Sequence, residues 1–183
     1  MTAPPERIGL PEVGAVLRRY ELADIDGVYA AVEESRDHLR PHMPWADESR
    51  QDLVAVLVEA VGQWGRRGDH GYAIVDATDD TYLGGCGLHD RVGPGVREIG
   101  YWLRAGATGR GLATAAARAL TEAALAIEDV TRVEIHCDEA NVRSAAVARR
   151  LGYRLDRIEP DRISAPDDRG RSMIWIWPAG ERP

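Results

Sequence analysis

The chain has 183 residues, of which 44% are hydrophobic and 29% charged, and its formal net charge is −7. This length and balance indicate a soluble globular protein of one domain. The negative charge does not fit a nucleic-acid-binding protein, and no apolar run approaches the roughly 20 residues of a membrane span. Because the chain begins without a secretory signal pattern, we expect a cytoplasmic protein that binds neither nucleic acid nor membrane.

All 23 basic residues are arginine, since the sequence contains no lysine. A phosphate-binding P-loop, which needs a lysine, is therefore excluded. Cys86 and Cys137 fall inside predicted strands. Their spacing, without paired cysteines or histidines nearby, favours two small buried side chains over a disulfide or a metal site.

The first half of the chain predicts two helices and three strands. Prolines at 41 and 44 break the helical pattern and predict a loop between the helices. The expected elements are a strand at Val16–Tyr20, a helix from about Asp24, a loop over Asp37–Ser49, a helix over Ser49–Gly62, and a hairpin of Tyr72–Val75 with Tyr82–Leu88.

The second half alternates strands with helices and ends in two strands. The expected elements are strands at Glu98–Leu103 and Arg132–Cys137, each followed by a helix, and then strands at Arg154–Ile158 and Met173–Trp177. Asn141 is placed as the N-cap of the second of these helices and Gly152 as its C-cap. The whole pattern indicates one mixed α/β domain.

Two strand-to-helix junctions carry the functional signal. Gly109-Arg110-Gly111 opens an alanine-rich helix, and Asn141 opens the next one. Backbone N–H groups at a helix start lie at the positive end of its dipole and bind phosphate readily. Two such junctions one crossover apart predict a clamp for a long phosphorylated cofactor, as in a coenzyme A transferase.

These motifs, in this order, resemble the GNAT superfamily of acyl-CoA-dependent N-acyltransferases. Three segments are similar to the ribosomal-protein alanine N-acetyltransferases of the RimJ/RimL type: Glu98–Leu103, Gly109–Thr114, and Asn141–Ser144 with Arg150–Tyr153. The resemblance extends from Leu17 to about Trp177. It implies one N-acyltransferase domain over residues 1–183 with a core at about 14–178. It further implies a mostly antiparallel mixed sheet of six to seven strands, flanked by about four helices.

The resemblance implies acetyl-CoA as cosubstrate, no metal, and a monomer or homodimer. The implied cofactor-binding residues are Leu103, Arg104, Gly109, Arg110, Gly111, Leu112, Ala113, Thr114, Asn141 and Arg149. Backbone N–H groups near Leu103 and Arg104 would polarise the thioester carbonyl. The chain departs from the family twice: Thr108 replaces an Arg or Gln of the cofactor loop, and Ala148 replaces a tyrosine that many members use as an acid.

Glu98 and Ser144 are the candidate catalytic residues. Burial in an apolar strand predicts a raised pKa for Glu98, which suits a general base. The alternative is a strand-end glutamate that pairs with Arg97 or Arg132. Ser144 has two interpretations of equal weight: it relays a proton to the departing thiolate, or it is a first-turn helix residue bonded to the cap. We interpret His89 and His136 as ordinary polar residues.

The proline-broken loop supplies candidate acceptor contacts in His42, Trp45 and Glu48. The predicted acceptor is an amine, and a protein N-terminal α-amine is the leading hypothesis. A small amine such as an antibiotic or polyamine is the alternative, which acidic residues at 33, 34, 47 and 48 would favour. A second alternative is an acyl-CoA sensor without turnover, motivated by Thr108 and Ala148.

Overall fold

The computed structural model describes residues 3–62, 64–66 and 69–178, and these form one eight-stranded sheet. Its strand order is β1-β2-β3-β4-β5-β6-β8-β7, and every pairing is antiparallel except β5 with β6. The mixed, mostly antiparallel sheet is confirmed. The strands are β1 (Arg7–Leu10), β2 (Ala15–Arg19), β3 (His70–Asp76), β4 (Tyr82–His89), β5 (Val96–Leu103), β6 (Arg132–Asp138), β7 (Arg154–Pro160) and β8 (Arg171–Ile176).

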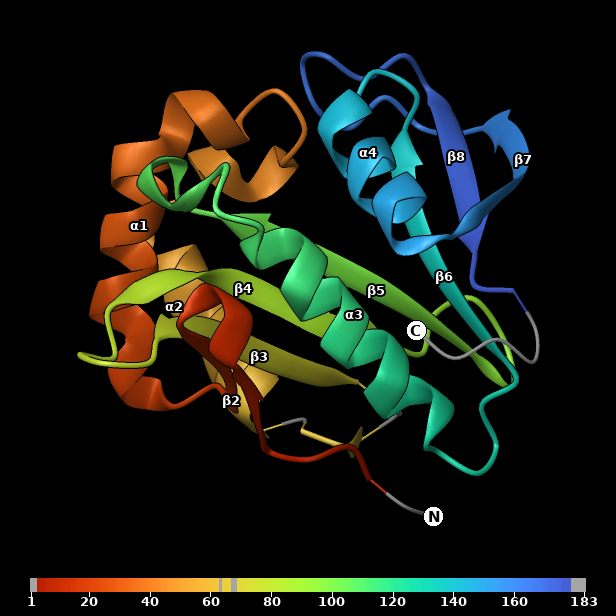
Figure 1. Cartoon of the computed structure of the whole chain (residues 1–183). Helices are drawn as coiled ribbons and strands as arrows, with labels where there is room; N and C mark the ends of the chain where they lie inside the picture. The colour runs from red at the N-terminus through yellow and green to blue at the C-terminus, as the bar shows by residue number, and fades with distance from the viewer. Residues whose placement is uncertain (1–2, 63, 67–68, 179–183) are drawn as a thin grey trace.

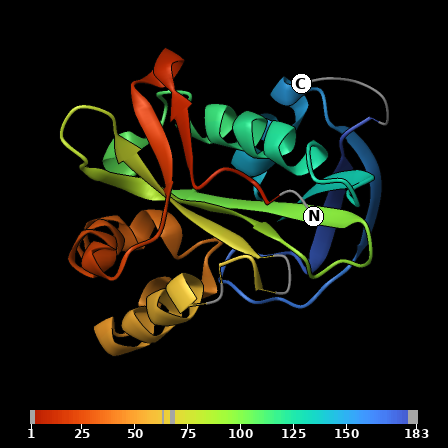
Figure 2. The same ribbon diagram turned by 90° about the horizontal axis from the view of Figure 1, so that it is seen from below.

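Two pairs of helices cover the two faces of this sheet (Figure 2). The α-helices among the described residues are α1 (Ile25–Leu39), α2 (Arg50–Gly62), α3 (Leu112–Leu125) and α4 (Val142–Leu151). One apolar core lies between the sheet and α3 with α4, and a second lies between the sheet and α1 with α2. We refer to the two sides as the α3/α4 face and the α1/α2 face.

Small residues bring α3 close to the sheet. Its buried side includes Leu112, Ala116 and Leu120, which follow helical spacing, together with Ala115 and Ala117. Alanine side chains allow close backbone approach and cost no side-chain entropy in a helix. The N-terminal end of α3 is thereby held firmly beside β5 and β4, against which the helix packs.

β5 and β6 separate after three paired residues on each strand. The parallel register covers only Val96–Glu98 with Arg132–Glu134, whereas on its other edge β6 stays paired with β8 as far as Asp138. Figure 1 shows the two strands diverging toward the N-terminus of α4. Backbone groups alternate sides along a strand. Because the Arg104 N–H bonds Leu83 of β4 at 2.9 Å, those of Tyr101 and Leu103 face the opening.

The N-terminal arm is the part of the sheet that sequence reasoning missed. β1 pairs with β2, and a short 3₁₀ helix, η1 (Pro11–Val13), joins them. Gly14 closes η1 in the left-handed region at φ 63°. The arm packs against α3. It raises the number of strands to eight, where six to seven were expected.

Capping interactions set the helix boundaries near the opening. The Asn141 side chain accepts a hydrogen bond from the Ser144 N–H at 3.0 Å, and Gly152 ends α4 at φ 96°. Both caps confirm the sequence prediction. Within the described ranges, we find no helix with the length and apolar character needed to cross a bilayer.

Candidate active site

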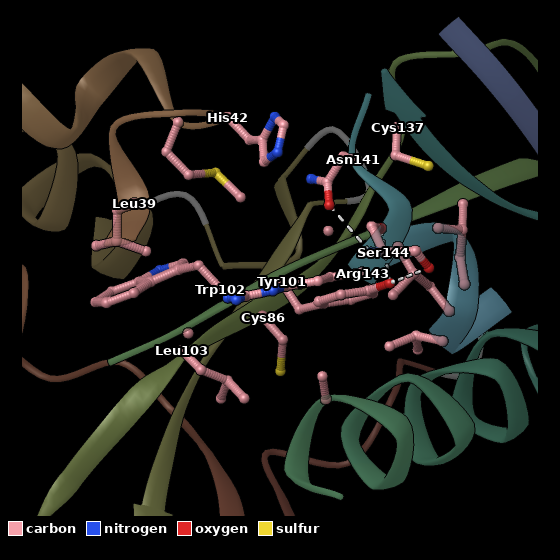
Figure 3. Close-up of a pocket in the computed structure, with 18 of the residues that line it drawn as sticks. Leu39, His42, Cys86, Tyr101, Trp102, Leu103, Cys137, Asn141, Arg143 and Ser144 are labelled. Carbon is pink, nitrogen blue, oxygen red and sulfur yellow. Dashed lines mark hydrogen bonds between the residues drawn. The ribbon is translucent and has the colours of Figure 1, made fainter. Parts of the chain in front are cut away.

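A cleft of about 1820 Å³ passes through the opening between β5 and β6. It is bounded on one side by α3 and α4 and on the other by α1, the following loop and α2. Neighbouring residues of β5 face opposite sides: Tyr101 points to Ser144, whereas Trp102 points toward Leu39 of α1 (Figure 3). The cleft therefore connects the two faces of the sheet.

The glycine turn before α3 is an open backbone cradle. Gly109 and Gly111 have φ values of 75° and 81°, in the left-handed region that favours glycine. A Cβ at Gly109 would meet nothing within 4 Å. The N–H groups of residues 109–114 find no acceptor elsewhere in the described part of the chain. Such a turn fits a diphosphate.

Most of the predicted cofactor-binding residues line the cleft, but three arginines do not. Those that line it are Leu103, Gly109, Gly111, Leu112, Ala113, Thr114 and Asn141. Arg104 is paired with Glu34, at 2.8 Å between Nη2 and Oε2, and its N–H is already bonded to Leu83. An oxyanion role for the Arg104 N–H is thus wrong.

The other two arginines also lie away from the cleft. Arg110 borders a separate small pocket beside Asp76, and Arg149 stacks on the Trp175 ring with its guanidinium carbon 4.9 Å from the centroid. Arg150, one residue further along α4, does line the cleft and donates to the Thr114 hydroxyl at 3.0 Å. The helical rotation of about 100° per residue separates these two neighbours.

Ser144 makes the predicted contact with the helix cap, and its hydroxyl lies beside a second hydroxyl group. Its N–H is bonded to the Asn141 cap, while its hydroxyl lies 2.9 Å from the phenol oxygen of Tyr101. Burial raises the pKa of Tyr101, so the phenol keeps its proton at neutral pH. Tyr101 thus places a phenol beside Ser144, near the start of α4. Ala148, which stands where many family members have a tyrosine, supplies no hydroxyl.

Two free cysteines line the same cleft. Burial raises the pKa of both the Cys86 and the Cys137 thiols. A thiol in this state is a poor nucleophile. The expectation of two small side chains in strands is confirmed, although Cys137 is only partly buried.

Glu98 is buried, with 6% of its surface exposed, and is paired with an arginine that the sequence did not suggest. Arg91 donates from Nε to one carboxylate oxygen at 2.7 Å and from Nη2 to the other at 2.5 Å. Burial alone would raise the pKa of Glu98, but this two-point contact and the neighbouring histidines lower it below its ordinary value. The predicted raised pKa is therefore wrong, and Glu98 is an ionised carboxylate.

Two histidines that sequence reasoning set aside also lie at the cleft, beside Glu98. His136 places Nε2 2.5 Å from the buried carboxylate of Glu134 and Nδ1 3.8 Å from Glu98 Oε2. The His89 ring lies against the Cα positions of Gly87 and Gly100, where a Cβ would come within 3.2 and 3.3 Å of it. Burial, with the nearby Arg91, lowers the pKa of His89. The alternation of Glu134 and His136 with apolar residues along β6 was the sequence signal that could have indicated this cluster.

The three candidate acceptor residues all line the α1/α2 side of the cleft. Trp45 packs edge-on against Trp102, with ring centroids 5.2 Å apart. His42 Nδ1 lies 3.8 Å from Asp168 Oδ1 in the β7–β8 connection, which also donates from the Asp167 N–H to Pro41. This connection therefore borders the cleft, although the sequence suggested no function for it.

Three of the four acidic residues expected to favour a polycation are paired with arginines. Glu33 contacts Arg36, Glu34 contacts Arg104, and Asp47 contacts Arg40 at 2.8 Å. None of the three acidic residues lines the cleft, whereas Glu48 does. Their charges are thus largely compensated outside the site.

A family profile described as an acetyltransferase (GNAT) domain matches residues 15–154. The chain belongs to the GNAT acetyltransferase family. The resemblance found in its motifs is thereby confirmed. No curated protein sequence matches the chain.

Solved structures of GNAT acetyltransferases share the fold at low sequence identity. The acetyltransferase that modifies the N-terminal serine of ribosomal protein L7/L12 from Salmonella typhimurium is 20% identical. Its TM-score is 0.81, with 94% of this chain and 98% of that chain covered. Mycobacterium smegmatis RimJ in complex with CoA-disulfide is 19% identical, with a TM-score of 0.80 and coverage of 96% and 90%.

An acetyltransferase described by a different role is equally similar. The microcin C7 self-immunity acetyltransferase MccE, in complex with acetyl-CoA and AMP, is 19% identical. Its TM-score is 0.80, with coverage of 90% and 92%. At these identities the likeness concerns the fold, and it does not select an acceptor for this GNAT chain.

Proposed function

We propose that this GNAT protein is a cytoplasmic enzyme that transfers an acetyl group from acetyl-CoA to a protein N-terminal α-amine. The observation that carries the proposal is the cleft through the β5–β6 opening, which has a phosphate cradle on one face and ionised side chains on the other. A cosubstrate enters from the first face and an amine from the second. The two free cysteines agree with a reducing compartment.

The α3/α4 face suits coenzyme A. The open N–H groups of the turn at Gly109–Gly111 would bind the diphosphate, with Arg150 and Arg118 at the margin of the cleft. The unpaired backbone of Tyr101 and Leu103 would hydrogen-bond the pantetheine arm, as an added strand does at a sheet edge. The Leu103 N–H, rather than that of Arg104, would polarise the thioester carbonyl.

Ser144 and Tyr101 would protonate the departing sulfur. Their hydroxyls meet on the α3/α4 face, the side of the phosphate cradle. The protonated phenol of Tyr101 is the better acid of the two, and Ser144 would relay its proton. Glu98, on the other face, would hold the incoming ammonium group by charge.

The pairing of charges near the cleft and one of the similar structures favour a polypeptide acceptor. The similar structure from Salmonella typhimurium is described as an acetyltransferase of a ribosomal protein. The arginine-paired acidic residues on α1 and in the loop after it weaken the case for a small polycation.

The proposal is tested by measuring thiol release from acetyl-CoA. The acceptors are a panel of peptides with different N-terminal residues, the same peptides with blocked N-termini, and a panel of small amines. We expect release with free N-termini only. Mass spectrometry should place the acetyl group on the α-nitrogen of the peptide.

A small-molecule amine is the second candidate, favoured by the similarity to MccE and by Glu48 at the cleft. Turnover with small amines and none with peptides would establish it. Binding of acetyl-CoA in calorimetry without thiol release from any acceptor would instead indicate a sensor.

A further inference from the structure

Glu98 does not explain how the amine loses its proton. Its carboxylate is held by two hydrogen bonds from Arg91, and its pKa is lowered. A carboxylate in this state is a weak base. It carries charge, yet it cannot efficiently take a proton from an ammonium group at neutral pH.

His136 lies where a base is needed. It is on β6, two residues beyond Glu134, which is the register partner of Glu98 on β5, and its ring borders the cleft. Glu134, two residues earlier on the same face of β6, is 2% exposed and contacts the Nε2 atom of the ring at 2.5 Å. An ionised carboxylate only accepts hydrogen bonds, so this contact keeps the proton on Nε2. The lone pair is then on Nδ1, beside Glu98.

We infer that His136 is the general base of the acetyl transfer and that Glu134 is the residue that positions it. The inference rests on the proposed function and assigns the proton-transfer step within it. The amine nitrogen would lie between His136 Nδ1 and Glu98 Oε2, which are 3.8 Å apart. Glu98 binds the cation, and His136 removes its proton directly or through one water.

The reaction of an ammonium substrate begins with proton transfer to His136. Nδ1 takes one proton from the ammonium group, which leaves a neutral amine and an imidazolium. The amine nitrogen forms the C–N bond to the thioester carbonyl, and the C–S bond breaks. The second proton of the nitrogen goes to the thiolate by way of Ser144 and Tyr101, and the imidazolium returns its own proton to solvent. The products are an amide, a thiol and one proton.

Charged groups surround His136 on several elements. The groups around His136 are Glu134 and Arg132 on β6, Glu98 on β5, His89 on β4 and Arg91 in the following loop, with Asp156 of β7 behind Arg132. Each arginine is paired with one of the two glutamates. One carboxylate oxygen of each glutamate nevertheless faces the ring, with Glu134 Oε2 2.5 Å from Nε2 and Glu98 Oε2 3.8 Å from Nδ1.

The test is the pH dependence of turnover in His136→Gln, with a peptide acceptor that the wild type acetylates. We expect kcat near pH 7 to fall by about 100-fold, the low end of the contribution of a general base. The KM for acetyl-CoA should change less than about threefold, because the cradle is untouched. The rate of the variant should rise with pH until the free amine predominates in solution. Imidazole in the buffer should partly restore His136→Ala.

Glu134→Gln separates positioning from folding. Loss of this anion should move the acidic limb of the wild-type pH profile to lower pH, because the imidazolium loses stabilisation. The same shift should appear in the NMR titration of the His136 ring, assigned by its absence in His136→Gln. Glu128→Gln, which replaces an exposed glutamate in the turn after α3, is the matched control. Circular dichroism would show whether each variant is folded.

Four outcomes decide the matter. An unchanged kcat and acidic limb in folded His136→Gln would overturn the inference while leaving the proposed function intact. Loss of the acidic limb in His89→Gln instead would assign the base to His89 and equally overturn it. If the wild type itself releases no thiol with any acceptor, the proposed function fails first, and with it the inference. If the His136 ring titrates in Glu134→Gln as it does in the wild type, Glu134 does not position the ring.

Discussion

The cleft is bounded by bare backbone and neutral hydroxyls on the α3/α4 face, but by ionised pairs and imidazoles on the α1/α2 face. The first side has the glycine turn and the Ser144–Tyr101 pair. The second has Glu98 with Arg91 and Glu134 with His136. A site that must hold an anionic cosubstrate and a cationic acceptor gains from this separation, because each group meets the electrostatic environment that suits it.

The largest effect should come from filling the phosphate cradle. Gly111→Trp places a bulky side chain at a backbone φ of 81°, which only glycine adopts readily. Losing two charge-assisted hydrogen bonds should weaken acetyl-CoA binding on the order of 100-fold, as measured by calorimetry. Gly62→Ala, on α2 with open space around it, is the control and should bind normally. Full affinity in Gly111→Trp would mean that this face does not bind the cofactor.

The contribution of the Glu98–Arg91 pair to stability can be measured by removing the arginine. Arg91→Met should lower the free energy of unfolding at pH 7 by roughly 2 kcal/mol, less than for a fully buried pair, since Arg91 is 62% exposed. The pKa of the paired carboxylate is lowered in the folded state. The stability that the carboxylate gives to the fold is therefore fully present above pH 4.5, its ordinary pKa, and is lost as the pH falls through the folded-state pKa.

The loss of unfolding free energy in Arg91→Met should therefore be largest at neutral pH and smaller at pH 4. Urea unfolding at the two values measures it. Exposed Arg162→Met provides the control for loss of one arginine. An equal deficit at both pH values would show that Arg91 acts through packing and not through the charge of Glu98.

The hydroxyl pair on the other face should matter for the rate rather than for binding. Tyr101→Phe is expected to reduce kcat about tenfold, and Ser144→Ala by less, because the phenol is the stronger acid. The double variant should be little worse than Tyr101→Phe alone, since both residues act through one hydrogen bond. Steady-state kinetics at saturating acetyl-CoA tests this. Additive losses would mean that the two hydroxyls act independently.

The smallest effect should come from narrowing the acceptor side. A Cβ at Gly100 would lie 3.3 Å from the His89 ring, so Gly100→Val pushes that ring into the cleft while suiting a strand. We expect the KM for the peptide to rise about fivefold, the equivalent of ~1 kcal/mol, with unchanged acetyl-CoA affinity. A matching rise in the KM for acetyl-CoA would show that the two faces are not separate sites.

Much of the fold followed from local patterns in the sequence. The apolar stripe of α3, the Asn141 and Gly152 caps and the glycine turn each depend on residues within one or two helical turns of each other. The β1 arm was missed because a four-residue strand bounded by Pro11 has too weak a period to stand out. The family and the position of the open glycine turn before α3 could likewise be predicted from short motifs.

The chemistry of the cleft was decided by tertiary structure. Sequence alone placed Glu98 in an apolar strand, but Arg91 reaches it across a turn and reverses the expected direction of its pKa. His136 lines the cleft because β6 and β5 part beyond Glu134, which no local pattern in the sequence indicates. Protonation depends on which charges lie within a few ångströms, and those distances join residues that are remote along the chain.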